Sequence, residues 1–174
     1  PLRVMVVGIP NVGKSSLINK ILGGKSIARV SSTPGKTVTI NFYRLNEFRL
    51  VDLPGYGYAK VADSERERWS ELMEGYFRTG RNIKLCLQLI DMRHPATEFD
   101  ISMLEFLTHF NIPYAVVLTK CDKLNKTEFN NRLSALKEEL GDFGNDIPII
   151  PFSALKGIGA EDIRKTIEKA IEEN

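Results

Sequence analysis

Eight residues near the start of the chain, Gly8–Ser15, have the types and spacing of a phosphate-binding loop. The run reads GIPNVGKS, in which Gly13, Lys14 and Ser15 follow Gly8 after four intervening residues. Glycines let the backbone turn its N–H groups onto phosphate oxygens. Lys14 can bridge the β- and γ-phosphates as a point charge, and the Ser15 hydroxyl can ligate Mg²⁺, which prefers oxygen. An ordinary turn between a strand and a helix explains this combination less well.

A carboxylate and a glycine farther along could respond to the third phosphate. Asp52 stands near the end of an expected strand, 48–53, and Gly55 follows Leu53 and Pro54. Asp52 can hold Mg²⁺ through a water molecule, and the Gly55 N–H can contact the γ-phosphate and so sense its loss. Alone, this pair also fits a bare turn. After a phosphate loop, it favours a nucleotide-dependent switch.

A threonine could complete the Mg²⁺ shell from the long polar segment 23–36 or from the residue that follows it. The run TPGKT offers both Thr33 and Thr37. We favour Thr37, because it stands just before an expected strand, 38–45, and therefore closer to the predicted site. Proline, glycine and threonine are also common turn residues, so a plain turn remains an equal alternative here.

Two short runs at the ends of later strands predict a pocket for a purine base. Thr119-Lys120-Cys121-Asp122 places a carboxylate that can accept hydrogen bonds from guanine N1–H and the 2-amino group. Adenine offers neither donor and would leave Asp122 desolvated and unpaired. The Lys120 stem can lie against the base, and the Ala154 N–H in the run Phe152-Ser153-Ala154 can bind guanine O6.

The motifs give one set of candidate residues for GTP or GDP with Mg²⁺. The candidate nucleotide-binding residues are Gly8, Asn11, Val12, Gly13, Lys14, Ser15, Ser16, Gly35, Lys36, Thr37, Asp52, Leu53, Pro54, Gly55, Thr119, Lys120, Asp122, Phe152, Ser153 and Ala154. The candidate catalytic residues are Lys14, Thr37, Gly55 and Asn11, and the candidate metal ligands are Ser15, Thr37 and Asp52.

The elements that must position these residues follow from the hydrophobic pattern. Expected strands cover 2–7, 38–45, 48–53, 83–90, 114–118 and 147–150, and expected helices cover 14–22, 64–78, 97–110, 127–140 and 159–171. Their mostly alternating order predicts an α/β fold with a mostly parallel six-stranded sheet and helices on both faces. Every motif then falls at the carboxyl end of a strand, where such sheets bind ligands.

The length and composition are those of one globular domain, 1–174. The chain has 174 residues, 43% hydrophobic and 26% charged, with net charge +2. That charge permits a nucleic-acid partner without arguing for one; four arginines, Arg66, Arg68, Arg78 and Arg81, fit an RNA-facing patch or, more simply, a solvated helix face. The two distant cysteines, the missing leader and the lack of a span of about 20 apolar residues predict a cytoplasmic protein without a membrane partner.

The motifs together resemble the EngB (YsxC/YihA) family of bacterial ribosome-assembly GTPases, among the TrmE-Era-EngA-EngB-like P-loop GTPases. The resemblance covers nearly the whole chain. It is carried by the runs GKSSLIN (13–19), TPGKT (33–37), VDLPGYGYAKV (51–61), DMRHP (91–95) and TKCDK (119–123). EngB loops usually read GRSNVGKS, whereas Ile9-Pro10 resembles YlqF-type GTPases, whose motif order is permuted and differs from the order here.

The resemblance implies a three-layer P-loop GTPase (Ras-like) fold and slow GTP hydrolysis. It also implies Mg²⁺ held at Ser15 and Thr37, help in assembling the large ribosomal subunit through that subunit or its rRNA, and a link to cell division and septation. We expect a monomer. Two alternatives remain: a GTP-dependent binding module with negligible hydrolysis, and a P-loop kinase of a small metabolite. The guanine-reading Asp122 and the lack of an obvious lid disfavour the kinase.

Tyr56 makes the expected turnover slow. It stands where Ras-like enzymes carry a glutamine that orients the attacking water, and a phenol ring cannot do this in the same way. Unassisted turnover is expected at or below roughly 10⁻⁴ s⁻¹. Some related GTPases without that glutamine use K⁺ bound by a loop asparagine, and Asn11 occupies the matching position. K⁺ binding and a structural cap of the loop are both open roles for Asn11.

Overall fold

The computed structural model describes residues 1–23, 29–33, 40–45, 47–53, 55 and 63–173, with the backbone alone described at 29–33 and 65. The strands are β1 (Arg3–Val7), β2 (Arg29–Thr33), β3 (Ile40–Arg44), β4 (Arg49–Leu53), β5 (Ile83–Asp91), β6 (Tyr114–Thr119) and β7 (Ile149–Pro151). The helices are α1 (Lys14–Leu22), α2 (Asp63–Arg78), α3 (Glu98–His109), α4 (Lys126–Leu140) and α5 (Ala160–Glu172), with 3-10 turns η1 (Cys121–Lys123) and η2 (Gly141–Gly144).

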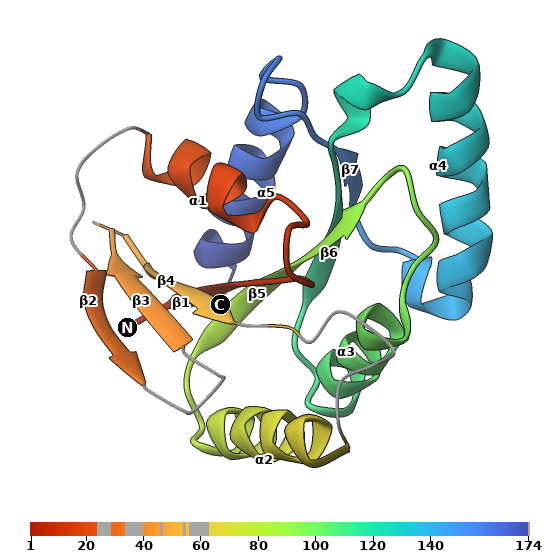
Figure 1. Cartoon of the computed structure of the whole chain (residues 1–174). Coiled ribbons are helices and arrows are strands. Elements are labelled where there is room, and N and C mark those ends of the chain that lie inside the picture. Colours follow the sequence, from red (N-terminus) through yellow and green to blue (C-terminus); the bar gives the residue numbers. More distant parts are fainter. Residues whose placement is uncertain (24–28, 34–39, 46, 54, 56–62, 174) are drawn as a thin grey trace.

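The strands form a mixed sheet in the order β2-β3-β4-β1-β5-β6-β7 (Figure 1). From β4 through β1, β5 and β6 to β7, each neighbouring pair is parallel. β3 is antiparallel to β4, and β2 is antiparallel to β3. The predicted α/β class, with a mostly parallel sheet between helices, is confirmed.

The number of strands differs from the prediction, because the described residues form seven strands and not six. The additional strand, β2, lies in the segment expected to be a long polar loop. Its residues, RVSST, include a single large apolar side chain and show no alternation. β2 pairs only with β3, at the edge of the sheet. Backbone hydrogen bonds to one neighbour hold an edge strand, and composition does not reveal them.

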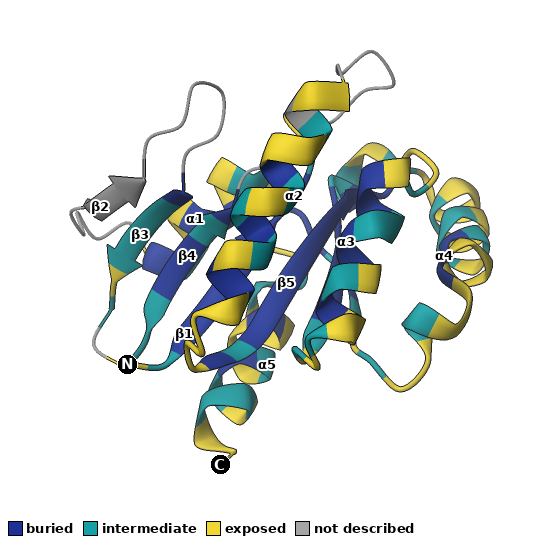
Figure 2. Ribbon diagram, turned by 90° about the horizontal axis from the view of Figure 1, so that it is seen from below, coloured by how far each residue is buried: buried dark blue, intermediate teal, exposed yellow. Residues whose placement is uncertain are grey.

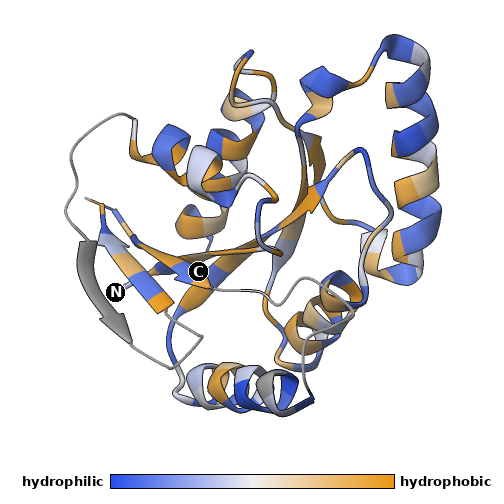
Figure 3. Cartoon of the chain, in the orientation of Figure 1, coloured by the Kyte–Doolittle hydropathy of each residue, from blue (hydrophilic) through white to orange (hydrophobic). Residues whose placement is uncertain are grey.

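Two apolar layers enclose the sheet, one on each face. Met5 and Val7 of β1 pack in the layer that contains α2, α3 and α4. Val4 and Val6 pack in the opposite layer with α1 and α5. Because β1 is covered on both faces, its sequence is continuously apolar. Figure 2 shows β5 almost wholly in the buried colour, and Figure 3 shows the central strands in the hydrophobic colour.

The described helices begin and end within one residue of the predicted bounds. Local capping explains this agreement for α3, because Thr97 and Asp100 form a reciprocal capping box at its start. Asn125 and Glu128 do the same for α4. Larger differences occur at two strands. β7 occupies Ile149–Pro151 where 147–150 is predicted, and β3 occupies Ile40–Arg44 where 38–45 is predicted, with residues 38 and 39 outside the described ones. Among the described residues, we find no helix with the length and apolar character needed to cross a membrane.

Candidate functional site

The loop between β1 and α1 has a left-handed backbone at two positions. Asn11 has φ 65°, and Gly13 has φ 107°. Gly13 is also the N-cap residue of α1, and it makes no side-chain cap. The N–H groups of the first turn of α1 therefore face the loop without a capping oxygen from that residue. A helix start of this kind is suited to an anion.

Two glycines bring the phosphate loop and the residues after β4 into backbone contact. A Cβ atom on Gly55 would lie 2.5 Å from the Gly8 carbonyl oxygen and 2.9 Å from a ring carbon of Phe99. A Cβ atom on Gly8 would lie 2.7 Å from a methyl group of Val12. Neither position has room for a side chain. Gly55 therefore lies against the loop predicted to hold the phosphates.

Lys14 connects the same two segments through its side chain. Its Nζ atom lies 2.6 Å from Asp52 Oδ1 and donates to the Leu53 carbonyl oxygen at 2.7 Å. The Lys14 and Asp52 side chains are 20% and 14% exposed. Asn41 Nδ2 approaches the other Asp52 oxygen at 3.5 Å. The structure thus places the lysine and the carboxylate, far apart in sequence, in direct contact.

The chemistry of Asp52 fits the predicted Mg²⁺ ion. Oδ1 of Asp52 is buried and makes no hydrogen bond among the described residues, although it forms an ion pair with Lys14 Nζ. A desolvated carboxylate oxygen of this kind is a suitable partner for a hard cation or its water shell. Ser15, from the first turn of α1, lines the adjoining pocket.

The run after β6 is tied to the phosphate loop by two side chains. The Thr119 hydroxyl donates to the Val12 carbonyl oxygen. Lys120 Nζ donates to the Asn11 carbonyl oxygen at 2.6 Å. Lys120 itself has a left-handed backbone, with φ 62°. The predicted base-binding residues and phosphate-binding residues therefore form one connected structure.

The end of β7 lies beside the turn that contains Asp122. The Cys121 N–H donates to the Phe152 carbonyl oxygen at 3.1 Å, and the Phe152 N–H donates to the Leu118 carbonyl oxygen at 2.8 Å. Asp122 follows within η1 and is partly exposed. Burial, followed by the negative charge of Asp122, raises the pKa of the Cys121 thiol, so this cysteine stays protonated at neutral pH.

The loop after β7 is held by its own backbone. The Ser153 N–H donates to the Ile158 carbonyl oxygen, and the Ser153 hydroxyl accepts from the Lys156 N–H at 3.0 Å. Ser153 is fully buried, while Ala154 is partly exposed. Ala154 is thus presented on a fixed loop next to the turn that carries Asp122.

A pocket of about 520 Å³ lies between the phosphate loop, the first turn of α1, Gly55 and Lys120. It is lined by Gly8, Ile9, Pro10, Asn11, Gly13, Lys14, Ser15, Ser16, Gly55 and Lys120. The base-side candidates Asp122, Phe152, Ser153 and Ala154 do not line it. The candidates Val12, Asp52, Leu53 and Thr119 contact its walls through the interactions given above. The predicted residues Gly35, Lys36, Thr37 and Pro54 lie outside the described residues, as does Tyr56.

Asp91 and Arg93 contact the site but are absent from the predicted set. Asp91, at the end of β5, lies 3.5 Å from Lys120 Nζ and accepts hydrogen bonds from Arg93. In the sequence, the DMRHP run that contains both residues marks the family resemblance and states no role in the site. The available signal was an acidic residue at the end of a long buried strand, the same signal that identified Asp52.

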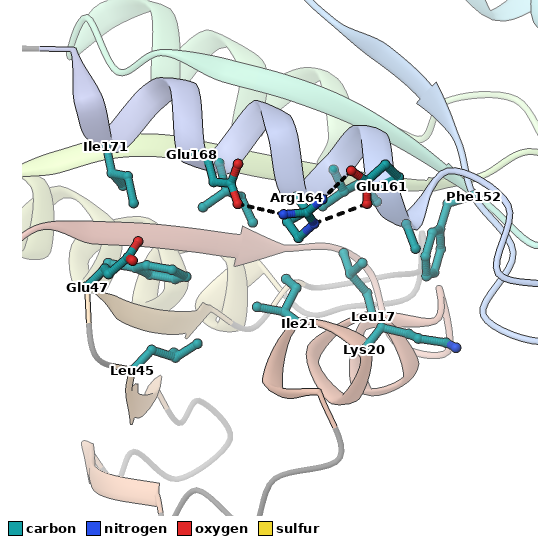
Figure 4. A pocket seen from close by; sticks show the side chains of 14 residues that line it. Leu17, Lys20, Ile21, Leu45, Glu47, Phe152, Glu161, Arg164, Glu168 and Ile171 are labelled. Carbon is teal, nitrogen blue, oxygen red and sulfur yellow. Dashed lines mark hydrogen bonds and ion pairs between the residues drawn. The ribbon is translucent and has the colours of Figure 1, made fainter.

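A second pocket, of about 270 Å³, lies between α1, α5 and the turn after β3 (Figure 4). Its walls are mainly apolar, with Leu17 and Ile21 among them. Its Arg164 guanidinium already pairs with Glu161 and Glu168. Charge neutralised in this way is poorly suited to phosphate, so the chemistry of the motifs belongs to the first pocket.

Comparisons with known proteins identify relatives of this chain. The family model described as "50S ribosome-binding GTPase" matches residues 3–120. The "Probable GTP-binding protein EngB" of Heliobacterium modesticaldum is 48% identical over 162 residues, which cover 92% of this chain and 78% of that protein. The protein of the same name from Anoxybacillus flavithermus is 46% identical over 94% of this chain and 85% of its own length.

Solved structures show the same fold. The crystal structure of "a probable GTP-binding protein engB" has a TM-score of 0.75 at 24% identity and covers 99% of this chain and 100% of that one. Era from Aquifex aeolicus, in a variant bound to GDP and AlF4⁻, has a TM-score of 0.68 at 26% identity, covering 99% of this chain and 58% of that one. The chain belongs to the EngB family of GTP-binding proteins, within the ribosome-binding GTPases.

Proposed function

We propose that this chain is a GTPase that switches between GTP-bound and GDP-bound states. The observation that carries the proposal is the backbone contact between Gly55 and Gly8, beside the Lys14–Asp52 ion pair. Loss of the γ-phosphate from the loop would therefore change the contacts of the segment after β4. This is the coupling that a γ-phosphate switch needs.

The proposed roles follow from position. Lys14 and the N–H groups of the loop neutralise charge that develops on the phosphates, and the Gly55 N–H contacts the γ-phosphate. Ser15 and Asp52, with Thr37, would hold Mg²⁺, which when bound supplies further positive charge to the phosphates. Lys14 and the ion are then alternative partners of the same Asp52 carboxylate.

The base specificity is tested by Asp122→Asn. An amide cannot accept both guanine hydrogen bonds, but its N–H₂ group suits the 2-oxo group of xanthine. We expect GTP affinity to fall at least about tenfold and xanthosine triphosphate affinity to rise. Asp162→Asn, an exposed position on α5, is the matched control and should change neither affinity. Unchanged GTP affinity in Asp122→Asn contradicts the base pocket.

Hydrolysis is tested by single-turnover release of phosphate from GTP, without any acceptor molecule. We expect slow release that depends on Mg²⁺. Release at the rate of spontaneous hydrolysis would favour the alternative, a binding module with negligible hydrolysis. Running the reaction in KCl and in NaCl tests whether Asn11 binds K⁺. Equal rates in the two salts would contradict K⁺ binding there.

The proposed biological partner is the large ribosomal subunit or its rRNA. Support comes from the matching family description, "50S ribosome-binding GTPase". We propose that the chain assists assembly of that subunit as a monomer in the cytoplasm, and that cell division depends on it through this role. The kinase alternative has no comparable support from the matching family or from the site.

A further inference from the structure

Asp91 is a buried carboxylate placed between the two halves of the proposed nucleotide site. It ends β5, which pairs with β1 on one side and with β6 on the other. β1 leads into the phosphate loop, and β6 leads into the base-binding run. Asp91 is only 8% exposed, and it stands opposite Thr119 in the register of the sheet.

Two cations converge on this carboxylate. Arg93 donates from its backbone N–H at 3.0 Å and from Nε at 3.1 Å to Asp91 Oδ1, and from Nη2 at 2.9 Å to Oδ2. Lys120 Nζ lies 3.5 Å from Oδ2. Burial alone would raise the pKa of Asp91, but the hydrogen bonds from Arg93 and the charge of Lys120 outweigh it and lower the pKa. Asp91 is therefore ionised at neutral pH.

The Lys120 ammonium group is shared between Asp91 and the phosphate loop. It donates to the Asn11 carbonyl oxygen at 2.6 Å while facing Asp91 Oδ2. Both Asn11 and Lys120 have a left-handed backbone that needs support from their surroundings. A long lysine side chain held at its tip on two sides loses most of its freedom before a ligand arrives.

We propose that Asp91 is a positioning residue for the guanine nucleotide. Its negative charge fixes the Lys120 ammonium, which presets the lysine stem that would lie against the base and secures the Asn11 turn of the phosphate loop. Arg93 donates hydrogen bonds to both oxygens of Asp91, shares Oδ2 with Lys120 and so fixes the carboxylate beside the lysine. This inference rests on the base pocket proposed above, which Asp122→Asn tests separately.

The test is the affinity for GDP of Asp91→Asn, which keeps the shape and removes the charge. We expect a loss of about tenfold, because a charge-assisted contact in a partly buried site is removed. The KM for GTP should rise by a similar factor with kcat within about twofold, since Asp91 acts through Lys120 of the base-binding run. Unchanged GDP affinity would overturn the proposal.

A double-mutant cycle with Lys120→Met separates positioning from a general structural role. If Asp91 acts through the ammonium, Asp91→Asn should have little further effect on GDP affinity in the Lys120→Met background. Additive losses would overturn the proposal. If Asp91→Asn does not fold, Asp91→Glu carries the test. It retains the charge and should keep GDP affinity within about threefold, whereas a loss as large as that of Lys120→Met would overturn the proposal.

Glu139→Gln is the matched control, because it loosens the same segment from its outer side. Glu139 accepts a hydrogen bond from the Ala96 N–H at 2.9 Å and pairs with Arg132, which donates to the carbonyl oxygens of Met92 and His94. Glu139→Gln should leave GDP affinity within about twofold of that of the unmodified chain. A loss equal to that of Asp91→Asn would overturn the proposal. If Asp122→Asn switches specificity and Asp91→Asn does nothing, the inference about Asp91 alone is wrong.

Discussion

A methyl group on Gly55 would meet the backbone of Gly8, which cannot move aside without distorting the phosphate loop. For Gly55→Ala we therefore expect destabilisation of about 1–3 kcal/mol, the usual cost of overpacking. GTP hydrolysis should fall at least about tenfold, since the N–H proposed to contact the γ-phosphate is displaced. Thermal unfolding and single-turnover hydrolysis measure the two effects.

Gly75→Ala is the matched control for that substitution. Gly75 lies in α2, and a Cβ atom there would have no neighbour within 4 Å. Alanine favours a helix over glycine by up to about 1 kcal/mol, so the melting temperature should stay the same or rise. If both variants have the same melting temperature and the same rate of GTP hydrolysis, the close contact at Gly55 does not contribute to function.

At the scale of single residues, the sequence identifies functional side chains when the residue type and the motif around it indicate their chemistry. Lys14 and Asp52 belong to recognisable runs, and the structure brings them within 2.6 Å. Asp91 carries the same sequence signal as Asp52, an acidic residue at the end of a buried strand, but that signal does not state its role. Its importance depends on which strand ends lie side by side, and on a shared partner, Lys120, that is distant in sequence.

At the scale of elements, α2 and α3 are connected to the site through aromatic rings. The Phe99 ring of α3 lies where it limits the space around Gly55. Trp69 of α2 meets Phe99 edge-on, with ring centroids 5.1 Å apart. Trp69 is the single tryptophan of the chain and is 2% exposed. A shift of Gly55 on loss of the γ-phosphate should therefore reach this ring.

We predict that tryptophan fluorescence differs between the chain bound to GDP and the chain bound to a non-hydrolysable GTP analogue. Because Trp69 is the source of all tryptophan emission, no labelling is needed. Phe99→Leu keeps an apolar side chain but removes the ring contact, and it should reduce the difference. Identical wild-type emission spectra in the two nucleotide states would show that the surroundings of Trp69 in α2 do not change when the γ-phosphate is lost.

The elements differ in how far their sequences specify them. The helices carry strong periodicity and local caps, such as the Thr97–Asp100 box, and their bounds are predicted within one residue. β2 carries no such signal, because an edge strand of mostly polar residues is stabilised by pairing with β3. Pairing between segments is a tertiary property, and the local sequence pattern of one segment does not reveal it.

At the scale of the whole molecule, the sheet explains why motifs distant in sequence form one site. β1, β4, β5, β6 and β7 run parallel as neighbours, so their carboxyl ends meet at one edge. The phosphate loop, Asp52, Asp91, the Lys120 run and the Phe152 loop each follow or end one of them. We propose that 1–174 forms a single GTP-binding domain built around that edge (Figure 1).

The central claim, a switch read by the large ribosomal subunit, is tested most directly by co-sedimentation with purified subunits. The chain is incubated with a non-hydrolysable GTP analogue, with GDP or without nucleotide, and its fraction in the pellet is measured. We predict that it sediments with the large subunit in the presence of the GTP analogue and stays in the supernatant with GDP. Equal sedimentation in all three conditions, or none in any, would contradict the account.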